Sequence, residues 1–201
     1  MSSAILLVGG LSTRMGQPKA LLPFDGEALV VHLVRRLRTR FDDLVVVAAQ
    51  GQDLPALDAN VVRDEIAEHG PIVGLHAAKH DGCFLASCDM PFLNAALAEH
   101  LVGQLGESDA VVPIMDGRLQ PLHAAYSRKI ADRLRAPIAN GELRMKDLIA
   151  RLRAKVVDED SLRAVDSSGL SFKNMNLPED YDAALRLWPE KGDRPIFGTR
   201  K

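Results

Sequence analysis

Short apolar runs alternate with helical patterns along most of this chain. Ala4–Val8 and Leu44–Ala49 are continuous apolar runs of strand length, which predicts two buried strands. Between them, from Ala28 to Phe41, apolar residues recur at helical spacing and predict an amphipathic helix. Buried strands that alternate with helices are typical of an α/β fold. We therefore expect a three-layer, Rossmann-like, mostly parallel sheet with helices on both faces.

The middle of the chain continues this alternation and adds a hairpin. Strands are expected at Asn60–Asp64 and Cys83–Asp89, the second ending on a carboxylate. A helix should enter through Pro71, and Asn94 should cap the next one. The pair Asp116–Gly117 predicts a tight turn after the strand "DAVVPI", so the sheet should include an antiparallel hairpin.

The last quarter of the chain has shorter patterns. Helices are expected near Ser127–Arg135 and Arg144–Arg153, and short strands between Lys155 and the end of "SFKNMN". A last helix is expected near Glu179–Leu187. Residues 189–201 lack periodicity, so we expect a mobile tail there. Because the chain has 201 residues and no repeat, residues 1–188 are expected to form one domain.

Composition argues against several classes of protein. The formal net charge is −2, from 25 basic and 27 acidic residues, so no global field favours nucleic acid or an anionic membrane. The apolar stretch at the amino terminus follows no positive region and is too short to cross a bilayer, so we expect a cytoplasmic protein. The two cysteines, Cys83 and Cys88, should point to opposite faces of one strand, which argues against a disulfide, and their number rules out a cysteine-rich metal site.

Two adjacent glycines, Gly9 and Gly10, end the first apolar run and open a loop with cationic residues. A P-loop would place a lysine directly after its last glycine, but Gln17 follows Gly16 here. A dinucleotide fingerprint needs G-x-G-x-x-G, which adjacent glycines do not fit. Neither of these two common phosphate loops is present.

The residues of this loop nevertheless suit a nucleoside triphosphate. Gly9 and Gly10 let the main chain pass close beneath a base or sugar, and the backbone N–H groups of such a turn can bind an anion. Arg14 offers a planar fork for two phosphate oxygens, and Lys19 offers a compact charge for a phosphoryl group. The alternative is a glycine turn followed by two solvated cations.

Asp89 stands where a metal ligand for that triphosphate is expected. Mg²⁺ in nucleotide sites is often held by one or two carboxylates together with phosphate oxygens. Asp89 ends an apolar strand, and ligands in open α/β sheets bind beyond the carboxyl ends of the strands, where the Gly9–Gly10 turn also lies. The alternative is that Asp89 only caps the turn before the next helix.

The stretch "LVGGLSTRMGQPKALL" resembles the signature of the molybdenum cofactor guanylyltransferases, L-A-G-G-x-S-x-R-M-G-x-x-K-x-L-L. Val8 replaces the family's usual alanine. Gly9 favours guanine over cytosine, because the related cytidylyltransferases usually have alanine there. The resemblance extends from about Ala4 to Ala184. The positions of the signature that match are Gly9, Gly10, Ser12, Arg14, Met15, Gly16, Lys19, Leu21 and Leu22.

The resemblance also implies roles for individual residues. It implies a fold of the nucleotide-diphospho-sugar transferase type and a magnesium ligand at Asp89, in "SCDMPFL". Lys19, Arg14 and Asp89 are then the catalytic residues. Ala48 stands where the family often has an asparagine, and Gln50 is the candidate to replace that contact. The implied nucleotide-binding residues are Leu7, Val8, Gly9, Gly10, Ser12, Arg14, Lys19, Asp64, Gly70, Pro71 and Asp89.

Segments nearer the carboxyl terminus resemble the acceptor side of the family. Asn174 and Asn176, in "FKNMNLPED", alternate along an extended chain and should share one face, and Asn176 is also the expected cap of the last helix. Gln120 and Arg144 are further implied acceptor contacts. His123 is either a base or a packed side chain, the more usual role of a lone histidine in a strand.

The function implied by the resemblance is nucleotidyl transfer. The terminal phosphate of molybdopterin would attack the α-phosphorus of GTP, pyrophosphate would leave, and Mg²⁺ would be the cofactor. Molybdopterin-handling proteins and molybdoenzyme chaperones are the implied protein partners. The alternatives are the same chemistry with CTP or a sugar-phosphate acceptor, a non-catalytic GTP-binding escort of the cofactor, and a redox protein that uses Cys83 and Cys88.

Overall fold

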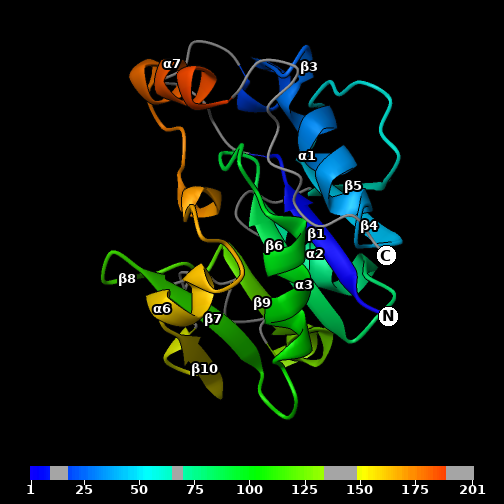
Figure 1. Cartoon of the computed structure of the whole chain (residues 1–201). Coiled ribbons are helices and arrows are strands. Elements are labelled where there is room, and N and C mark those ends of the chain that lie inside the picture. The colour runs from blue at the N-terminus through cyan, green and yellow to red at the C-terminus, as the bar shows by residue number, and fades with distance from the viewer. Residues whose placement is uncertain (10–17, 65–69, 134–148, 189–201) are drawn as a thin grey trace.

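Residues 1–9, 18–64, 70–133 and 149–188 are described in the computed structural model, which forms a twisted sheet with helices packed on it (Figure 1). The strands are β1 (Ser3–Leu7), β2 (Pro23–Phe24), β3 (Glu27–Ala28), β4 (Asp43–Ala49), β5 (Asn60–Asp64), β6 (Gly82–Ser87), β7 (Ala110–Met115), β8 (Arg118–Leu119), β9 (His123–Ser127) and β10 (Ala154–Val157). The α-helices are α1 (Leu29–Arg38), α2 (Gly70–Ala77), α3 (Ala95–Gly103), α6 (Glu159–Arg163) and α7 (Pro178–Leu187). Short 3₁₀ helices are η1 (Lys19–Leu21), η2 (Arg128–Ile130) and η3 (Leu170–Phe172).

The central sheet has the strand order β10-β7-β9-β6-β1-β4-β5, and β8 pairs with β7. β1 pairs in parallel with β4 on one side and with β6 on the other, and β4 pairs in parallel with β5. β9 runs antiparallel to both β6 and β7. Asp116 and Gly117 join β7 to β8 with φ angles of 50° and 70°, as a two-residue hairpin turn requires. The predicted mostly parallel sheet with an antiparallel hairpin is therefore confirmed.

Two apolar cores lie on opposite faces of this sheet. The first contains side chains of α1 and α3, such as Leu33 and Leu97, and the second contains side chains of α2, such as Ile72. Successive residues of β1 alternate between them, since Ile5 enters the second core and Leu6 the first. Burial on both faces explains why β1 is a continuous apolar run.

Element boundaries on the amino-terminal side of residue 130 match the expectations closely. The strand expected at Cys83–Asp89 is β6, which ends at Ser87, so that Asp89 lies two residues beyond the ladder. Asn94 caps α3 as predicted, since its Oδ1 accepts hydrogen bonds from the N–H groups of Ala96 and Leu97. The helix expected at Ala28–Phe41 is α1, which is shorter at both ends.

The expected strand through "SFKNMN" is wrong. Instead, η3 follows a compact turn in which the Asp166 carboxylate accepts hydrogen bonds from the Ser171 N–H and from the hydroxyl groups of Ser168 and Ser171. Gly169 completes the turn with a φ of 64°. Short polar side chains that bond to nearby backbone compete with strand pairing, which is why the apolar residues of this segment did not form a strand.

Three further expectations lie partly or wholly outside the described residues. The helix expected near Ser127–Arg135 begins as η2. Residues 134–148, which include most of the helix expected near Arg144–Arg153, and the expected tail 189–201 lie outside the described residues. Across the described ranges, the longest apolar helix falls short of what a membrane crossing would require.

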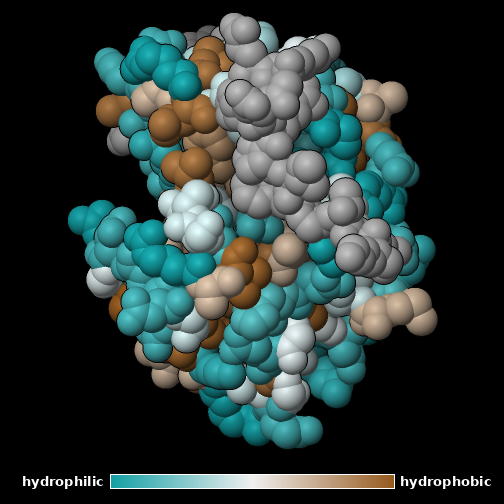
Figure 2. Space-filling model, viewed as in Figure 1, coloured by the Kyte–Doolittle hydropathy of each residue, from teal (hydrophilic) through white to brown (hydrophobic). Residues whose placement is uncertain are grey.

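The last helix, α7, lies beside α1 and the β2–β3 hairpin (Figure 1). The Tyr181 hydroxyl donates to the carbonyl of Pro23 at 2.5 Å. Trp188 follows the helix and packs edge-on against His32, with ring centroids 5.0 Å apart, and against Phe24 at 5.5 Å. Hydrophobic residues remain visible over this helix in Figure 2, and the exposed ones are Leu177, Leu185 and Leu187. The contacts of Tyr181 and Trp188 hold α7 against β2 and α1.

Gly74 allows α2 to lie directly on the sheet. A Cβ at this position would lie 2.4 Å from Ile5 Cγ2 and 3.1 Å from Val47 Cγ2. We therefore expect Gly74→Ala to lower the free energy of unfolding by about 1–3 kcal/mol through overpacking, measured by urea denaturation. Gly103→Ala in α3 is the matched control, because nothing lies within 4 Å of its Cβ position. That variant should be neutral or stabilised by up to about 1 kcal/mol, and equal effects of the two changes would contradict the packing argument.

Candidate active site

The carboxyl ends of β1, β4, β5 and β6 lie along one edge of the sheet. After β1 the chain adds β4 and β5 on one side, and it then returns to place β6 on the other side. The connecting helices α1 and α2 consequently cover opposite faces. The direction of winding therefore reverses beside β1. In open α/β sheets the crevice at such a switch point binds ligands.

Asp89 lies at this edge, just beyond β6. The β1–β6 ladder continues past the strand, because the Cys88 N–H donates to the Leu7 carbonyl at 2.9 Å. Asp89 follows directly, and its own carbonyl accepts the Met175 N–H at 2.8 Å. Its Oδ1 is buried and has no hydrogen-bond partner within the described residues. A buried carboxylate oxygen without a donor suits a hard divalent cation, which takes oxygen ligands.

Lys19 begins η1 and lies close to the same place. Its Nζ donates to Asn176 Oδ1 at 3.0 Å. Burial raises the pKa of the Cys88 thiol to about 12, with the Asp89 charge acting in the same direction and the Lys19 charge in the opposite direction. The Met175 N–H bonds to Asp89 and the neighbouring Asn176 bonds to Lys19, so one segment links the two residues at this edge of the sheet.

The segment before α7 connects to both of these groups. Met175 is buried while Asn174 and Asn176 are exposed, which confirms the predicted alternation. The expected role of Asn176 as helix cap is wrong, since α7 begins after Leu177. The Asp180 carboxylate accepts the N–H groups of Asn176 and Leu177, each at 2.9 Å. An acidic side chain inside the first turn thus replaces the cap, and the Asn176 amide points toward η1 instead.

Three predicted nucleotide contacts meet on the α2 side of the edge. A Cβ built on Gly70 would lie 3.5 Å from Leu7 Cδ2 and 3.6 Å from Asp64 Oδ2. Gly9 lies against β4, where a Cβ would be 3.2 Å from the backbone nitrogen of Ala49. The lack of a side chain at Gly9 thus lets the start of the glycine loop touch the neighbouring strand.

The structure does not bring the remaining predicted site residues together with those described above. Val8 and Pro71 are buried, so their side chains serve the fold and only their main chain could face a ligand. Gln120 lies between β8 and β9, and its Nε2 donates to the carbonyl of Arg118 at 3.3 Å. The predicted residues Gly10, Ser12, Arg14 and Arg144 lie outside the described residues.

His123 is a packed side chain. Its ring lies edge-on between Phe84 and Phe172, with centroids 5.0 Å and 4.9 Å away. It is fully buried, and neither ring nitrogen has a hydrogen-bond partner in the part of the chain that the structure describes. Burial lowers its pKa to about 4, although the charge of Asp166 acts in the opposite direction. A neutral, enclosed imidazole cannot reach a substrate proton, so the role of base is not supported.

Comparison with known proteins identifies the family. Residues 4–156 match the model of the MobA-like NTP transferase domain, which covers most of the sheet and the edge described above. The chain belongs to the MobA-like NTP transferase family.

Individual MobA-like relatives align over nearly the whole chain. A probable molybdenum cofactor guanylyltransferase of Mycobacterium tuberculosis (strain H37Rv) is 36% identical over 194 residues, covering 92% of this chain and 93% of the relative. One from Pelotomaculum thermopropionicum is 32% identical over 183 residues, covering 89% of each chain. Among solved structures, molybdopterin-guanine dinucleotide biosynthesis protein A from Archaeoglobus fulgidus superposes with a TM-score of 0.78 at 26% identity, over 93% of this chain and 98% of that one. The chain is therefore a nucleotidyltransferase, and the predicted family resemblance is confirmed.

The positions of the two cysteines in this MobA-like chain argue against a redox role. Cys83 belongs to the α2 core and Cys88 to the opposite core, as predicted, and both are free thiols. Burial raises the pKa of each to about 12. Both thiols are therefore protonated at neutral pH, and the thiolate is the reactive form.

Near the end of β4, an amide that the sequence did not single out reaches the sheet edge. Ala48 is fully buried, and Gln50 is exposed and makes no side-chain hydrogen bond in the described ranges. Gln52 reaches the edge instead, since its Nε2 donates to the Val8 carbonyl at 3.1 Å. The signal that could have pointed to it is Gly51, a turn residue directly after a strand.

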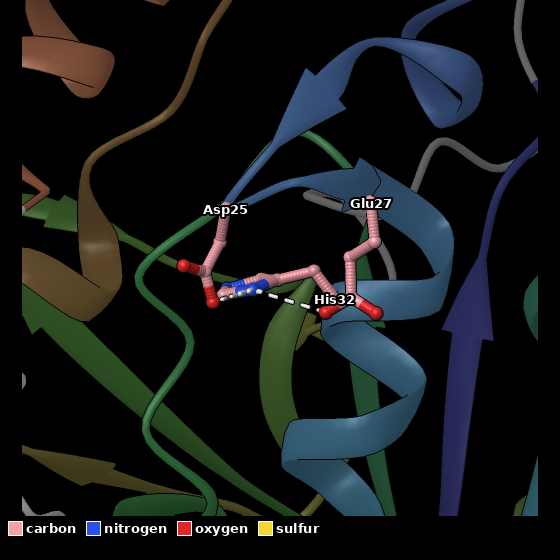
Figure 3. A group of neighbouring side chains, drawn as sticks. All are labelled: Asp25, Glu27 and His32. Carbon is pink, nitrogen blue, oxygen red and sulfur yellow. Dashed lines mark ion pairs between the residues drawn. The ribbon is translucent and has the colours of Figure 1, made fainter. Parts of the chain in front are cut away.

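Figure 3 shows a second group of ligating side chains, Asp25, Glu27 and His32, where the β2–β3 hairpin meets α1. His32 Nε2 lies 3.0 Å from the Pro91 carbonyl and so carries the ring proton, while Nδ1 lies 3.8 Å from a carboxylate oxygen of Asp25 and of Glu27. Arg35 Nη2 lies 3.1 Å from Asp25 Oδ2, 2.6 Å from Glu27 Oε1 and 3.4 Å from His32 Nδ1. The guanidinium lies against the same side-chain atoms that a metal ion would use, so the group is an ion-paired anchor for the hairpin.

Proposed function

We propose that this protein transfers GMP from GTP to the terminal phosphate of molybdopterin and releases pyrophosphate. The observation that carries the proposal is the segment Met175–Asn176, which bonds to Asp89 and to Lys19 at the switch-point edge, where Asp89 has a buried oxygen without a donor in the described residues. The names of the relatives support the choice of GTP and molybdopterin, since they describe molybdenum cofactor guanylyltransferases and a molybdopterin-guanine dinucleotide biosynthesis protein.

The reaction exchanges one phosphoanhydride bond for another. An oxygen of the acceptor phosphate forms a bond to the α-phosphorus, and the bond from that phosphorus to the bridging oxygen breaks, so that pyrophosphate leaves with the electron pair. A phosphate monoester is already anionic at neutral pH, so no strong base is needed. Lys19 stabilises the charge that develops on the transferring group, and such catalysis consists mainly of positioning and electrostatics.

The side chains around the edge have separate tasks in this proposal. The Asn176 amide orients the Lys19 ammonium by accepting a hydrogen bond from it. Because the amide is uncharged, this bond does not neutralise the charge of the lysine. Asp89 would hold Mg²⁺ through its unpartnered Oδ1, and the ion would supply positive charge to the phosphate oxygens. Arg14 is assigned to the departing phosphates. Leu7, Val8, Gly9, Gly10, Ser12, Asp64, Gly70 and Pro71 form the proposed nucleotide-binding surface.

The acceptor side is assigned to polar residues next to these groups. Asn174 and Asn176 are exposed, and Asn176 lies beside η1. Gln120 and Arg144 are the further proposed contacts with molybdopterin. Proteins that deliver molybdopterin and chaperones that receive the product are proposed partners, on the family resemblance alone.

A nucleotide competition assay tests this function. With purified protein, molybdopterin and Mg²⁺, we expect GTP to give more pyrophosphate release than CTP, because the relatives that align over nearly the whole chain are named guanylyltransferases. Omission of molybdopterin is the control, since transfer needs the acceptor. Preference for CTP would establish the cytidylyl alternative, and GTP binding without pyrophosphate release would indicate an escort protein. A Tm that rises with the bound nucleotide reports the selectivity independently, since a ligand at 100 times its Kd stabilises by about 2.7 kcal/mol.

A further inference from the structure

The β1–β4 ladder opens at the carboxyl edge one step after the strand β1 ends. The two strands pair in parallel up to Leu7 and Val47, and the Val8 N–H still donates to the Val47 carbonyl at 2.9 Å. In a regular parallel ladder the next bond would run from the Ala49 N–H to the Val8 carbonyl. That direct bond is absent among the described residues, so the strands separate where the glycine loop begins.

The side chain of Gln52 takes the place of the missing bond. Its Nε2 donates to the Val8 carbonyl at 3.1 Å, and its Oε1 accepts the Ala49 N–H at 3.2 Å. One carboxamide thus satisfies the acceptor of one strand and the donor of the other, as a peptide group of an intervening strand would. The spacing between the two strand ends is therefore set by the width of this amide.

The backbone around Gln52 holds the side chain in this position. The Gln52 N–H donates to the Ala49 carbonyl at 3.2 Å, which closes a tight turn, and Gly51 at its third position has a φ of 71° that glycine adopts without strain. From β5, the guanidinium of Arg63 donates to the carbonyl of Gln52 at 2.7 Å and to that of Ala49 at 3.3 Å. The amide is therefore preorganised by the turn and by the neighbouring strand.

We infer that Gln52 is a positioning residue for nucleotide binding: its amide keeps the ends of β1 and β4 apart at the spacing that the main chain of Leu7–Gly9 needs to receive the nucleotide. The inference rests on the proposed function. Without the amide, Val8 and Ala49 can pair directly, and Gly9, whose Cβ position is already 3.2 Å from the Ala49 nitrogen, must move. Lys19 and Asp89, the residues proposed to carry the chemistry, lie on the β6 side of β1, so they keep their contacts when the Gln52 amide is removed.

Binding and turnover of the full-length protein test the inference. We expect Gln52→Ala to raise the Kd and KM for GTP roughly tenfold, about the effect of one hydrogen bond, while kcat at saturating GTP changes little. Gln52→Glu keeps the shape and the acceptor for the Ala49 N–H but turns a carboxylate oxygen toward the Val8 carbonyl, and it should bind GTP at least as weakly. Gln104→Ala, which removes a glutamine at the carboxyl end of α3 whose amide bonds to His100, is the matched control and should bind like the wild type.

The outcomes separate this inference from the proposed function. Weaker GTP binding in both Gln52 variants, with wild-type binding in Gln104→Ala, supports the positioning role. Unchanged binding in Gln52→Ala overturns it, and so does tighter binding, which would mean that the amide blocks the base instead of supporting its site. A fall in kcat with an unchanged KM would also overturn it. Failure of the wild-type protein to bind GTP would refute the proposed function, and the inference with it.

Discussion

Replacement of Lys19 or of Asp89 by alanine is expected to lower kcat for guanylyl transfer at least ~100-fold, the loss typical of removing one preorganised electrostatic group. Lys19 supplies positive charge held in place by Asn176, and Asp89 supplies a buried carboxylate oxygen without a hydrogen-bond donor in the described residues. Each acts on charge that builds up in the transition state. Neither can be replaced by water, which would have to reorganise during the reaction.

Steady-state pyrophosphate release, with each variant saturated in GTP and molybdopterin, measures this loss. Lys129→Ala and Asp81→Ala are matched controls, because these residues form an ion pair of 3.2 Å at the start of β6, the opposite end of that strand from Asp89. Both controls should retain the wild-type kcat. Near-wild-type turnover in Lys19→Ala or Asp89→Ala would show that the assigned chemistry is wrong.

Stability should fall steeply as the pH drops from 6.5 to 4. His32 and His123 are fully exposed to water only in the unfolded chain, where their ordinary pKa is 6.5, while burial lowers the pKa of each to about 4 in the folded protein. In that window the unfolded state binds protons that the folded state excludes, so the free energy of unfolding decreases with falling pH. Each histidine accounts for about 3 kcal/mol. Together they remove a large part of the 5–15 kcal/mol that is typical of a folded domain.

Urea denaturation at several pH values between about 7.5 and 4 checks this expectation. His123→Leu removes one of the two groups and leaves an apolar side chain among Phe84 and Phe172, so about half of the pH dependence should disappear. His100→Ala is the control, because His100 is exposed and its loss should leave the profile unchanged. Identical profiles for the wild type and His123→Leu would contradict the assignment of the buried pKa.

The sheet and the two ends of its central strands were predictable from the sequence because they follow from periodic burial. Runs such as Ala4–Val8 are apolar since both faces of β1 are covered, and Asn94 caps α3 through a local bond. Lys19 and Asp89 could also be singled out from the sequence, because strand ends of a parallel sheet meet at one edge and because both residues lie in segments that resemble the family.

Contacts between distant side chains and backbone were not predictable in the same way. Gln52 and Val8 are 44 positions apart in the sequence, and Asn176 and Lys19 are 157 positions apart. Neither hydrogen bond produces a periodic pattern in the sequence from which it could be predicted. The strand expected in "SFKNMN" failed because Asp166 bonds to serines of the same turn, a local preference that overrides an apolar pattern. Such bonds depend on the finished arrangement of the elements.

The attachment of Met175 and Asn176 to the segments of Asp89 and Lys19 bears on how the protein is made. A growing polypeptide that has left the ribosome as far as Val157 possesses every strand of the sheet, yet it lacks the partners that order the two reactive groups. We therefore expect a chain synthesised only as far as Val157 to be inactive in guanylyl transfer.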